Sequence, residues 1–440
     1  MRRQSIFETM STGDMGEFVM EQNDKEFAFI KEKIKDKPIN KKRLLMRIAY
    51  DILFAFVFGV TACFAFVYFK PHIEEWMHPK KDQTITIPKD EEPKAEAENE
   101  TKEEPQKPDT VYVQEKLDVE GYQELQKDLY AIGKQANKSV VTVTGVISKT
   151  DIFNTPYESQ NQAAGVIIAN NGHELLILTE RKVIADAKSL SITFNDNQTV
   201  SAALKKYDGN TGIAIVGVKL SDISQETMNR IEVATLGNSL MLTQGSMVIA
   251  IGNPLGANYS ILCGTITSSQ NKVTTIDNNY TIFTTDMVGS ESGSGALINL
   301  SGEVVGVVLK DYSNQGDRNT ITALSISELK QIIEDLSNNQ DIPYLGLRIS
   351  AVTDEIADKY SIPKGVYVKG VEMDSPAMTA GIQEADVIVK MNGNDVVSVE
   401  QYNQFLMELK PGDEMKITVK RQGAEEYVDL NCKAVIGVLK

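Results

Sequence analysis

The pattern of apolar and polar positions divides the chain into segments of different character. An uninterrupted apolar run covers residues 52–69 and is long enough to cross a bilayer. Lys and Arg are frequent before this run, a bias that favours a cytoplasmic N-terminus, and bulky and basic residues stand where a signal peptide would have its cleavage site. We therefore expect a cytoplasmic segment over 1–47 and a single transmembrane helix over 48–70, which places the rest of the chain outside the plasma membrane.

A polar segment separates this apolar run from the remainder of the chain. Residues 79–110 are rich in Pro, Glu and Lys and poor in apolar residues. Such a composition buries too little apolar surface to offset the entropy lost on ordering. The composition predicts a disordered stalk over 71–110.

Short strand-like runs dominate the chain beyond this polar segment. Apolar residues recur at helical spacing over 122–136, and residues 139–146 then alternate as a strand does. From there to about residue 324 the pattern is one of short β-type runs separated by turn residues, which is typical of a barrel or sandwich. A helix is predicted over 325–336, opened by a capping box from Ser325 to Glu328.

Charge and cysteine usage exclude several classes of function. The 440 residues carry a formal net charge of −16, whereas nucleic-acid binding needs clustered Lys and Arg. The three cysteines, Cys63, Cys263 and Cys432, are far apart and have neither disulfide-framework nor metal-ligand spacing. We therefore expect no nucleic-acid partner, no metal site and no cofactor.

Several motifs in the β-rich part resemble the HtrA family of envelope proteases. The strongest are ATLGNSLMLTQGSMVIAIGNPLG at residues 234–256 and ALINLSGEVVGVVL at residues 296–309. The resemblance implies a mainly β fold: a chymotrypsin/trypsin-like double β-barrel over 111–338, followed by an α+β PDZ domain over 341–440. With the N-terminal segments, the expected architecture is one transmembrane helix, a disordered stalk and these two domains.

The residues that a trypsin-like protease needs for proton transfer are missing at their expected positions. Such an enzyme requires a histidine to take the proton of the serine and a carboxylate to orient that histidine. By alignment with the family's motifs, Lys182 stands at the histidine position and Gly212 at the aspartate position. The three histidines of the chain are His72, His78 and His173, and none of them occupies that place.

The position of the nucleophile depends on how the serine loop is aligned. The loop DMVGSESGSGAL is one residue shorter than the family's segment. Counting from Asp286 puts Ser294 at the nucleophile, whereas counting back from Leu297 puts Gly293 there. The shortening also removes part of the run whose amides form the oxyanion hole, and one such donor is worth on the order of 100- to 1000-fold in rate.

The C-terminal segment resembles a PDZ domain whose peptide site is intact. Its carboxylate-binding loop, as the resemblance implies, would offer backbone amides to a terminal carboxylate, and the next strand would pair with the peptide by strand addition. The residues expected to bind peptide are Tyr344, Leu345, Gly346, Leu347, Arg348 and Ile349.

These observations favour a non-catalytic, membrane-anchored sensor or scaffold that binds C-terminal or unfolded peptide segments in envelope protein quality control. The alternative is an active endopeptidase with an atypical Ser-Lys site formed by Ser294 and Lys182, although the adjacent Glu180 favours a charged ammonium that cannot accept a proton. A third hypothesis, implied by the family's trimers, is a homo-trimer or an assembly with active relatives. Enzymatic activity is left open by the sequence.

Overall fold

The computed structural model divides the chain into two compact units, Met1–Lys80 and Lys81–Lys440. The residues that it describes are Lys42, 45–46, 49–50, 52–62, 83–91, 118–150, 156–309 and 319–439. In the first unit residues 49–50 and 52–62 are helical, while the rest of the expected span and nearly all of the expected cytoplasmic segment lie outside the described residues. Among the residues that are described, no helix is both long and apolar enough to span a membrane.

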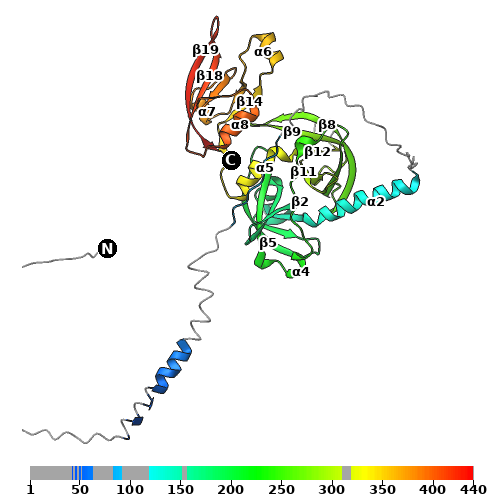
Figure 1. The fold of residues 1–440 in the computed structure, drawn as a ribbon, viewed down its shortest axis with the longest axis vertical. Coiled ribbons are helices and arrows are strands. Elements are labelled where there is room, and N and C mark those ends of the chain that lie inside the picture. The colour runs from blue at the N-terminus through cyan, green and yellow to red at the C-terminus, as the bar shows by residue number, and fades with distance from the viewer. Residues whose placement is uncertain are drawn as a thin grey trace, which may run out of the picture. The chain divides into compact units, whose positions relative to one another are not determined.

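Two closed six-stranded barrels form the first part of the second unit, which confirms the expected double barrel (Figure 1). The first barrel has the order β1-β2-β3-β6-β5-β4 and the second the order β10-β11-β12-β9-β8-β7. The strands of the first barrel are β1 (Val140–Thr150), β2 (Pro156–Asn170), β3 (Glu174–Glu180), β4 (Ser189–Thr193), β5 (Thr199–Tyr207) and β6 (Ile213–Lys219). Those of the second are β7 (Met247–Asn253), β8 (Ser260–Thr274), β9 (Asn279–Val288), β10 (Ser294–Ile298), β11 (Val304–Val308) and β12 (Thr320–Ser325).

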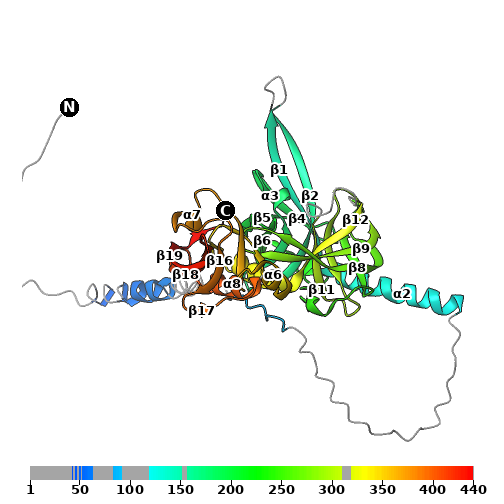
Figure 2. The same cartoon turned by 90° about the horizontal axis from the view of Figure 1, so that it is seen from above.

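Alternating apolar residues explain why these runs become strands with one face in a barrel core. In β1, for example, Val141 and Val143 lie in the core of the first barrel. The hairpin of β1 and β2 extends well beyond the barrel wall (Figure 2). The 18-residue helix α2 (Val119–Ala136) precedes the strands, and two short helices connect them: α3 (Arg181–Ile184) and α4 (Gln225–Met228). Three 3₁₀ turns lie at Asn137–Ser139, Leu220–Asp222 and Ser239–Met241.

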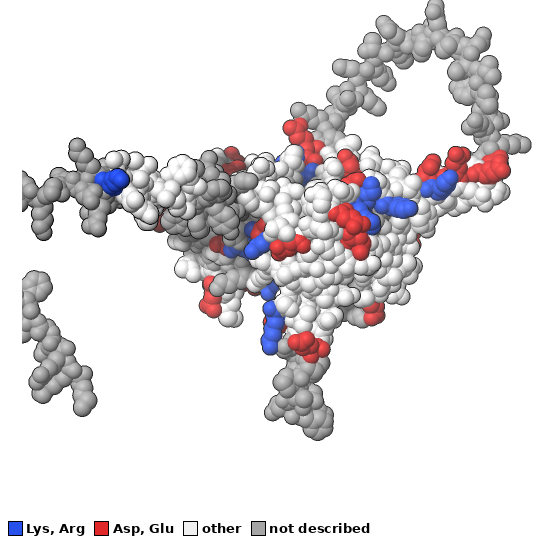
Figure 3. All heavy atoms as spheres, turned by 90° about the horizontal axis from the view of Figure 1, so that it is seen from below, with Lys and Arg blue, Asp and Glu red and all other residues white. Residues whose placement is uncertain are grey.

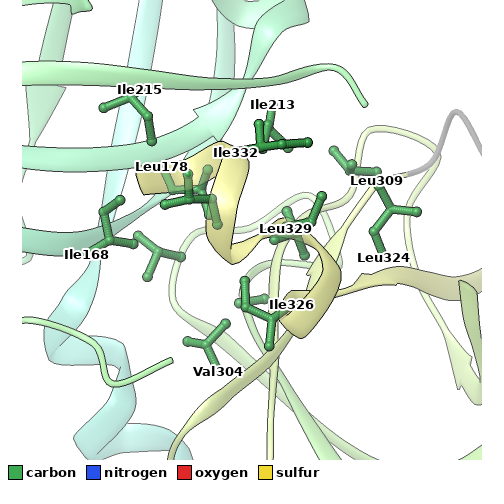
Figure 4. Packing of buried hydrophobic residues seen from close by; sticks show 14 of the residues in the cluster. Ile168, Leu178, Ile213, Ile215, Val304, Leu309, Leu324, Ile326, Leu329 and Ile332 are labelled. Carbon is green, nitrogen blue, oxygen red and sulfur yellow. The ribbon is translucent and has the colours of Figure 1, made fainter. Parts of the chain in front are cut away.

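Helix α5 (Ile326–Ser337) packs between the two barrels. Its residues Ile326, Leu329 and Ile332 belong to one apolar cluster with residues of both barrels, and Figure 4 shows them near Leu178 and Leu324. Burying one such side chain contributes roughly 1.5–3 kcal/mol, so this helix holds the barrels together.

The expected capping box at the start of α5 is wrong. The Ser325 side chain makes no capping hydrogen bond. The Glu328 carboxylate accepts hydrogen bonds from the Thr281 amide at 2.6 Å and the Thr281 hydroxyl at 2.7 Å instead. Glu328 therefore binds Thr281 on β9 and does not cap its own helix.

The structure also differs from the expected stalk over residues 83–91, which lie against α5. Ile85 and Ile87 pack on the apolar cluster between the barrels. The Ile85 amide donates to Asn338 Oδ1 at 2.9 Å, and Asp90 forms an ion pair with the buried Lys330 at 2.8 Å. The alternation of Ile85 and Ile87 with threonine in TITIP indicates a segment that can pack one face on a core, a pattern that overall composition does not reveal.

A separate domain with its own apolar core follows α5, as expected. Its main sheet has the order β14-β15-β16-β18-β19, with β17 beside β16. Ser375 caps α7 by accepting from the Met378 amide at 3.1 Å, as Ser-Pro at this point predicts. The elements are β13 (Pro343–Tyr344), β14 (Leu347–Ala351), α6 (Asp354–Tyr360), β15 (Val366–Val371), α7 (Pro376–Thr379), β16 (Val387–Met391), β17 (Asn394–Asp395), α8 (Val399–Met407), β18 (Glu414–Gln422), β19 (Tyr427–Val435) and β20 (Gly437–Val438).

The surface carries charges of both signs. On the face drawn in Figure 3, acidic and basic side chains of the described residues alternate, with uncharged surface between them. This distribution lacks the basic stripe that a nucleic-acid interface would need on that face.

Candidate functional site

The positions expected for a catalytic histidine and aspartate lie next to each other in the first barrel. Lys182 belongs to α3, directly after β3, and Gly212 precedes β6, which pairs with β3. The Arg181 amide donates to the Gly212 carbonyl at 2.7 Å. The backbone therefore brings the two positions together, and the residues found there are a lysine and a glycine, whereas a trypsin-like triad uses histidine and aspartate.

The ammonium of Lys182 is held by a carboxylate. Lys182 Nζ forms an ion pair with Glu180, whose side chain is only 5% exposed. The neighbouring Arg181 guanidinium stacks over the Tyr207 ring at 4.3 Å. An ammonium engaged in an ion pair has no lone pair with which to act as a base.

Ser294 lies inside the protein. Its relative exposure is 0%, and it stands in β10 opposite Asn253. The Ser294 hydroxyl oxygen accepts a hydrogen bond from the Ala164 amide of β2 at 2.8 Å. In this position the hydroxyl joins the two barrels and is not presented to a substrate.

Gly293, the other candidate for the nucleophile position, has no room for a side chain. A Cβ added there would lie 2.6 Å from the Pro254 carbonyl oxygen. The amides of the loop are also occupied: Ser290 donates to the Pro254 carbonyl at 2.8 Å and Gly293 to the Ser290 carbonyl at 2.9 Å. Amides committed to the loop itself cannot stabilise an oxyanion.

His173 is distant from this region. It stands immediately before β3, whereas Lys182 follows the end of the same seven-residue strand. At about 3.4 Å per residue the strand separates them by roughly 20 Å. His72 and His78 lie outside the described residues.

The expected carboxylate-binding loop converges on a carboxylate from the second barrel. The amides of Leu345 and Gly346 each donate to Asp277 Oδ2 at 2.8 Å, and the Leu347 amide donates to Oδ1 at 3.0 Å. The Tyr402 hydroxyl of α8 donates to the same Oδ1 at 2.6 Å. The loop and Tyr402 thus bind a carboxylate through four donors.

Glycine is required at the centre of this loop. Gly346 has φ +92°, and an added Cβ would lie 2.3 Å from the Ser375 Cβ. Leucine side chains on both sides, Leu345 and Leu347, are fully buried and anchor the loop in the domain core. The backbone is therefore fixed with its amides directed at one point.

Burial controls the ionisation of this cluster. Burial, together with the nearby Asp277 charge, raises the pKa of Tyr402 well above its usual value, so the hydroxyl remains a donor. Burial also raises the pKa of Asp277, while the amides of Gly346, Leu345 and Leu347 and the Tyr402 hydroxyl act in the opposite direction.

The remaining residues expected at the peptide site have other surroundings. Tyr344 pairs with Gly437 in a two-stranded sheet, and Ile349 is buried in the core. The exposed Arg348 guanidinium donates to Glu372 at 2.7 Å. Arg348 and Ile349 nevertheless lie on β14, the strand that follows the loop.

Comparisons with known proteins match this architecture. The family model for the trypsin-like peptidase domain matches residues 163–307, and that for the PDZ domain matches residues 343–432. The serine protease Do-like HtrB of Bacillus subtilis is 33% identical over 285 residues, which cover 59% of this chain and 59% of that protein. The chain therefore resembles this HtrA-type protease, and the two family models show that it combines a trypsin-like peptidase domain with a PDZ domain.

Other proteins named as HtrA-type or DegP-like proteases are also similar to this chain. A probable periplasmic DegP-like endoprotease of Hahella chejuensis is 29% identical over 276 residues, covering 61% of this chain and 56% of that protein. The chain therefore spans less than three fifths of the length of these two relatives. A solved HtrA-type protease, AlgW with a decapeptide, has a TM-score of 0.52 at 22% identity, covering 70% of this chain and 98% of that one. At that identity the likeness shows the fold alone.

Asp277 was not among the residues expected at the site. Tyr402 belongs to an apolar helical face over residues 399–409, whose spacing predicts that most members are core and that one or two line the peptide pocket, without indicating which. Asp277 stands in a polar run typical of a hairpin turn, and nothing in that run indicates a partner in another domain. Among the described residues, no group of three or more His, Cys, Asp or Glu could hold a metal ion.

Proposed function

We propose that this protein is a membrane-anchored peptide-binding sensor or scaffold whose trypsin-like domain does not cleave bonds. The main support for this proposal is the ion pair of Lys182 with Glu180, because Lys182 stands at the position expected for the general base. Gly212 stands at the position expected for the carboxylate that would orient that base. The role would be recognition of C-terminal or unfolded segments in envelope protein quality control.

The geometry of the PDZ loop supports the binding half of the proposal. Three consecutive amides are directed at a carboxylate, which is how such a loop would hold a terminal carboxylate. The HtrA-type protease AlgW, which shares the fold, is described with a decapeptide and with a tripeptide. A Gly346→Pro variant should lose peptide binding, and unchanged affinity would refute this assignment.

The apolar run over residues 52–69 supports anchoring, and the basic residues before it support a cytoplasmic N-terminus with both domains outside. Protease added to intact cells should therefore digest the C-terminal domains and spare a tag at the N-terminus. Digestion of the tag with protection of the domains would contradict this orientation.

The competing function is an endopeptidase that uses Ser294 with Lys182. The relatives described above are named serine proteases, which favours this alternative, whereas the buried hydroxyl of Ser294 and the ion-paired Lys182 oppose it.

Digestion of an unfolded protein by the purified full-length chain separates the two functions. The full chain is needed because residues 83–91 pack on α5. We expect no cleavage by the wild type, Ser294→Ala or Lys182→Ala, with trypsin as the positive control. Cleavage by the wild type that both substitutions abolish would establish a Ser-Lys protease.

Assembly is a separate part of the proposal. An assembly with active relatives would place the peptide-binding domain beside catalytic sites that this chain does not supply, whereas a homo-trimer would bring several copies of the peptide-binding domain together. Native mass determination and co-purification with a relative distinguish the two, and a monomer that co-purifies with no relative would exclude both.

A further inference from the structure

The PDZ carboxylate loop is occupied by another part of the same chain. Asp277 lies in the turn between β8 and β9 of the second barrel, and it is buried under the loop. Its carboxylate receives the three loop amides and the Tyr402 hydroxyl at 2.6–3.0 Å. Each of the amides that a peptide terminus would need is therefore engaged.

The backbone of this turn also pairs with the PDZ domain as an added strand would. The Asp277 amide donates to the Leu347 carbonyl at 2.6 Å, and Ile276 forms an antiparallel bridge with Arg348 on β14. The Asn279 side-chain amide donates to the Ile349 carbonyl at 3.3 Å. Main-chain pairing along the same strand is the means by which such domains hold a peptide.

The turn is shaped for this contact by the barrel that carries it. Asp277 has φ +59°, a left-handed conformation that Asp tolerates better than most residues. The Thr275 amide closes the turn on the Asn278 carbonyl at 2.9 Å. From the first barrel, Asn210 Nδ2 donates to the Ile276 carbonyl at 2.7 Å.

We propose that Asp277 is an internal ligand of the PDZ carboxylate loop, so that a free C-terminal peptide binds only when the 275–278 turn has left the site. This inference rests on the proposed peptide-binding function. Two carboxylates cannot accept the same amide hydrogens at the same point, so internal and external ligands exclude each other. A tethered ligand competes at an effective concentration on the order of millimolar for a short linker.

The same geometry identifies the ligand class and a further specificity residue. Four donors bind the Asp277 carboxylate, three backbone amides and one tyrosine hydroxyl, and none of these four is a cationic side chain. The site therefore suits the terminal carboxylate of a peptide that adds to β14 through its backbone. Tyr402 supplies the fourth donor and would contact the incoming carboxylate directly.

Peptide titration of matched variants of the full-length chain tests the proposal. The probes are fluorescent decapeptides with a free carboxylate that end in Val, Leu, Phe or Asp, with their C-terminally amidated counterparts. Asp277→Asn keeps the shape but directs an amide NH₂ at donors, and Asp277→Gly removes the carboxylate and relaxes the left-handed backbone. Asp358→Asn, at an exposed position of α6, is the control.

We expect both Asp277 variants to bind a free-acid peptide on the order of tenfold or more tighter than the wild type, because apparent affinity scales with the fraction of open sites. The control should bind as the wild type does. Equal affinity of all four proteins would overturn the internal ligand while leaving the peptide-binding function supported.

If no peptide binds to any of the four proteins, hydrogen exchange at the loop amides tests the internal ligand independently. Without peptide, the amides of Leu345, Gly346 and Leu347 should be protected in the wild type and in the control, and should exchange faster in both Asp277 variants. That result with no peptide binding would refute the proposed function yet support the internal ligand. Unchanged exchange in both variants would overturn the internal ligand.

Discussion

The Ser294 hydroxyl accepts a hydrogen bond from the Ala164 amide at 2.8 Å and so links β10 of the second barrel to β2 of the first. We expect Ser294→Ala to lower the free energy of unfolding by about 1–3 kcal/mol, because a buried amide would lose its partner. Urea denaturation measures the loss. Ser301→Ala, at an exposed position, should change little, and equal stability of the two variants would show that the bond contributes nothing.

Placing histidine, aspartate and serine at the three expected catalytic positions should not produce proteolysis. In a Lys182→His, Gly212→Asp, Gly293→Ser variant, the serine Cβ would lie 2.6 Å from the Pro254 carbonyl, and the aspartate would need the φ of +75° that Gly212 has. A left-handed backbone costs a non-glycine residue roughly 1–2 kcal/mol. We expect no cleavage of an unfolded substrate and a lower melting temperature. Cleavage above the wild-type level would show that these three substitutions are sufficient for proteolysis and would contradict the prediction.

Removing the Tyr402 hydroxyl should weaken the contact between the barrels and the PDZ domain. Tyr402→Phe keeps the buried ring but deprives the Asp277 carboxylate of one donor, which we expect to cost about 1.5–3 kcal/mol of unfolding free energy. Chemical denaturation is the measurement. Tyr360→Phe, where the ring is 61% exposed, is the control, and equal midpoints for both variants would contradict the prediction.

Asp90 should be important for stability although it lies in a segment of disordered-type composition. Asp90→Ala would leave the Lys330 ammonium, whose side chain is 5% exposed, without its carboxylate. Breaking a buried pair in this way costs about 3–5 kcal/mol, and the 13% exposure of Asp90 places this pair toward the lower end. Thermal unfolding measures it against Glu91→Ala, an exposed neighbour that should behave as the wild type does.

Asp286 should contribute to the acid sensitivity of the fold. Hydrogen bonds from Thr265, its amide foremost at 2.7 Å, lower the pKa of Asp286 below its usual value. Because the folded-state pKa is depressed, this stabilisation is present above pH 3.8 and is lost as the pH falls through the lower, folded-state value. Denaturation midpoints at neutral and acidic pH should differ less for Asp286→Asn. An unchanged pH dependence would show that the contact is not retained in solution.

Local patterns predicted the elements well where their partners are close in the sequence. The alternation in residues 139–146 became β1, and Ser375-Pro376 became a capped helix start. The Asn392-Gly393 pair, a sequence typical of a two-residue hairpin loop, is the turn between β16 and β17, with positive φ at both residues. In each case the residue and its neighbours determine the conformation.

Contacts between distant segments could not be predicted in the same way. Glu328 has the spacing of a capping box, yet its carboxylate accepts from the amide and the hydroxyl of Thr281 on β9. Whether Ser294 is a nucleophile or a buried link depends on the pairing of β10 with β7, which the loop length left open. The sequence around Asp277 indicates only a turn, because its four hydrogen-bond donors belong to another domain.

The attachment of residues 83–91 to α5 constrains the order of folding during synthesis. The Ile85 amide bonds to Asn338, which lies 253 positions later in the chain. At roughly 5–20 residues per second, a ribosome adds that length in about 13–50 s. During this interval α5 is not yet complete, so Ile85 and Ile87 lack the apolar surface on which they pack and the cluster between the barrels is incomplete. The segment translated first among those described in this unit is therefore one of the last to reach its final place.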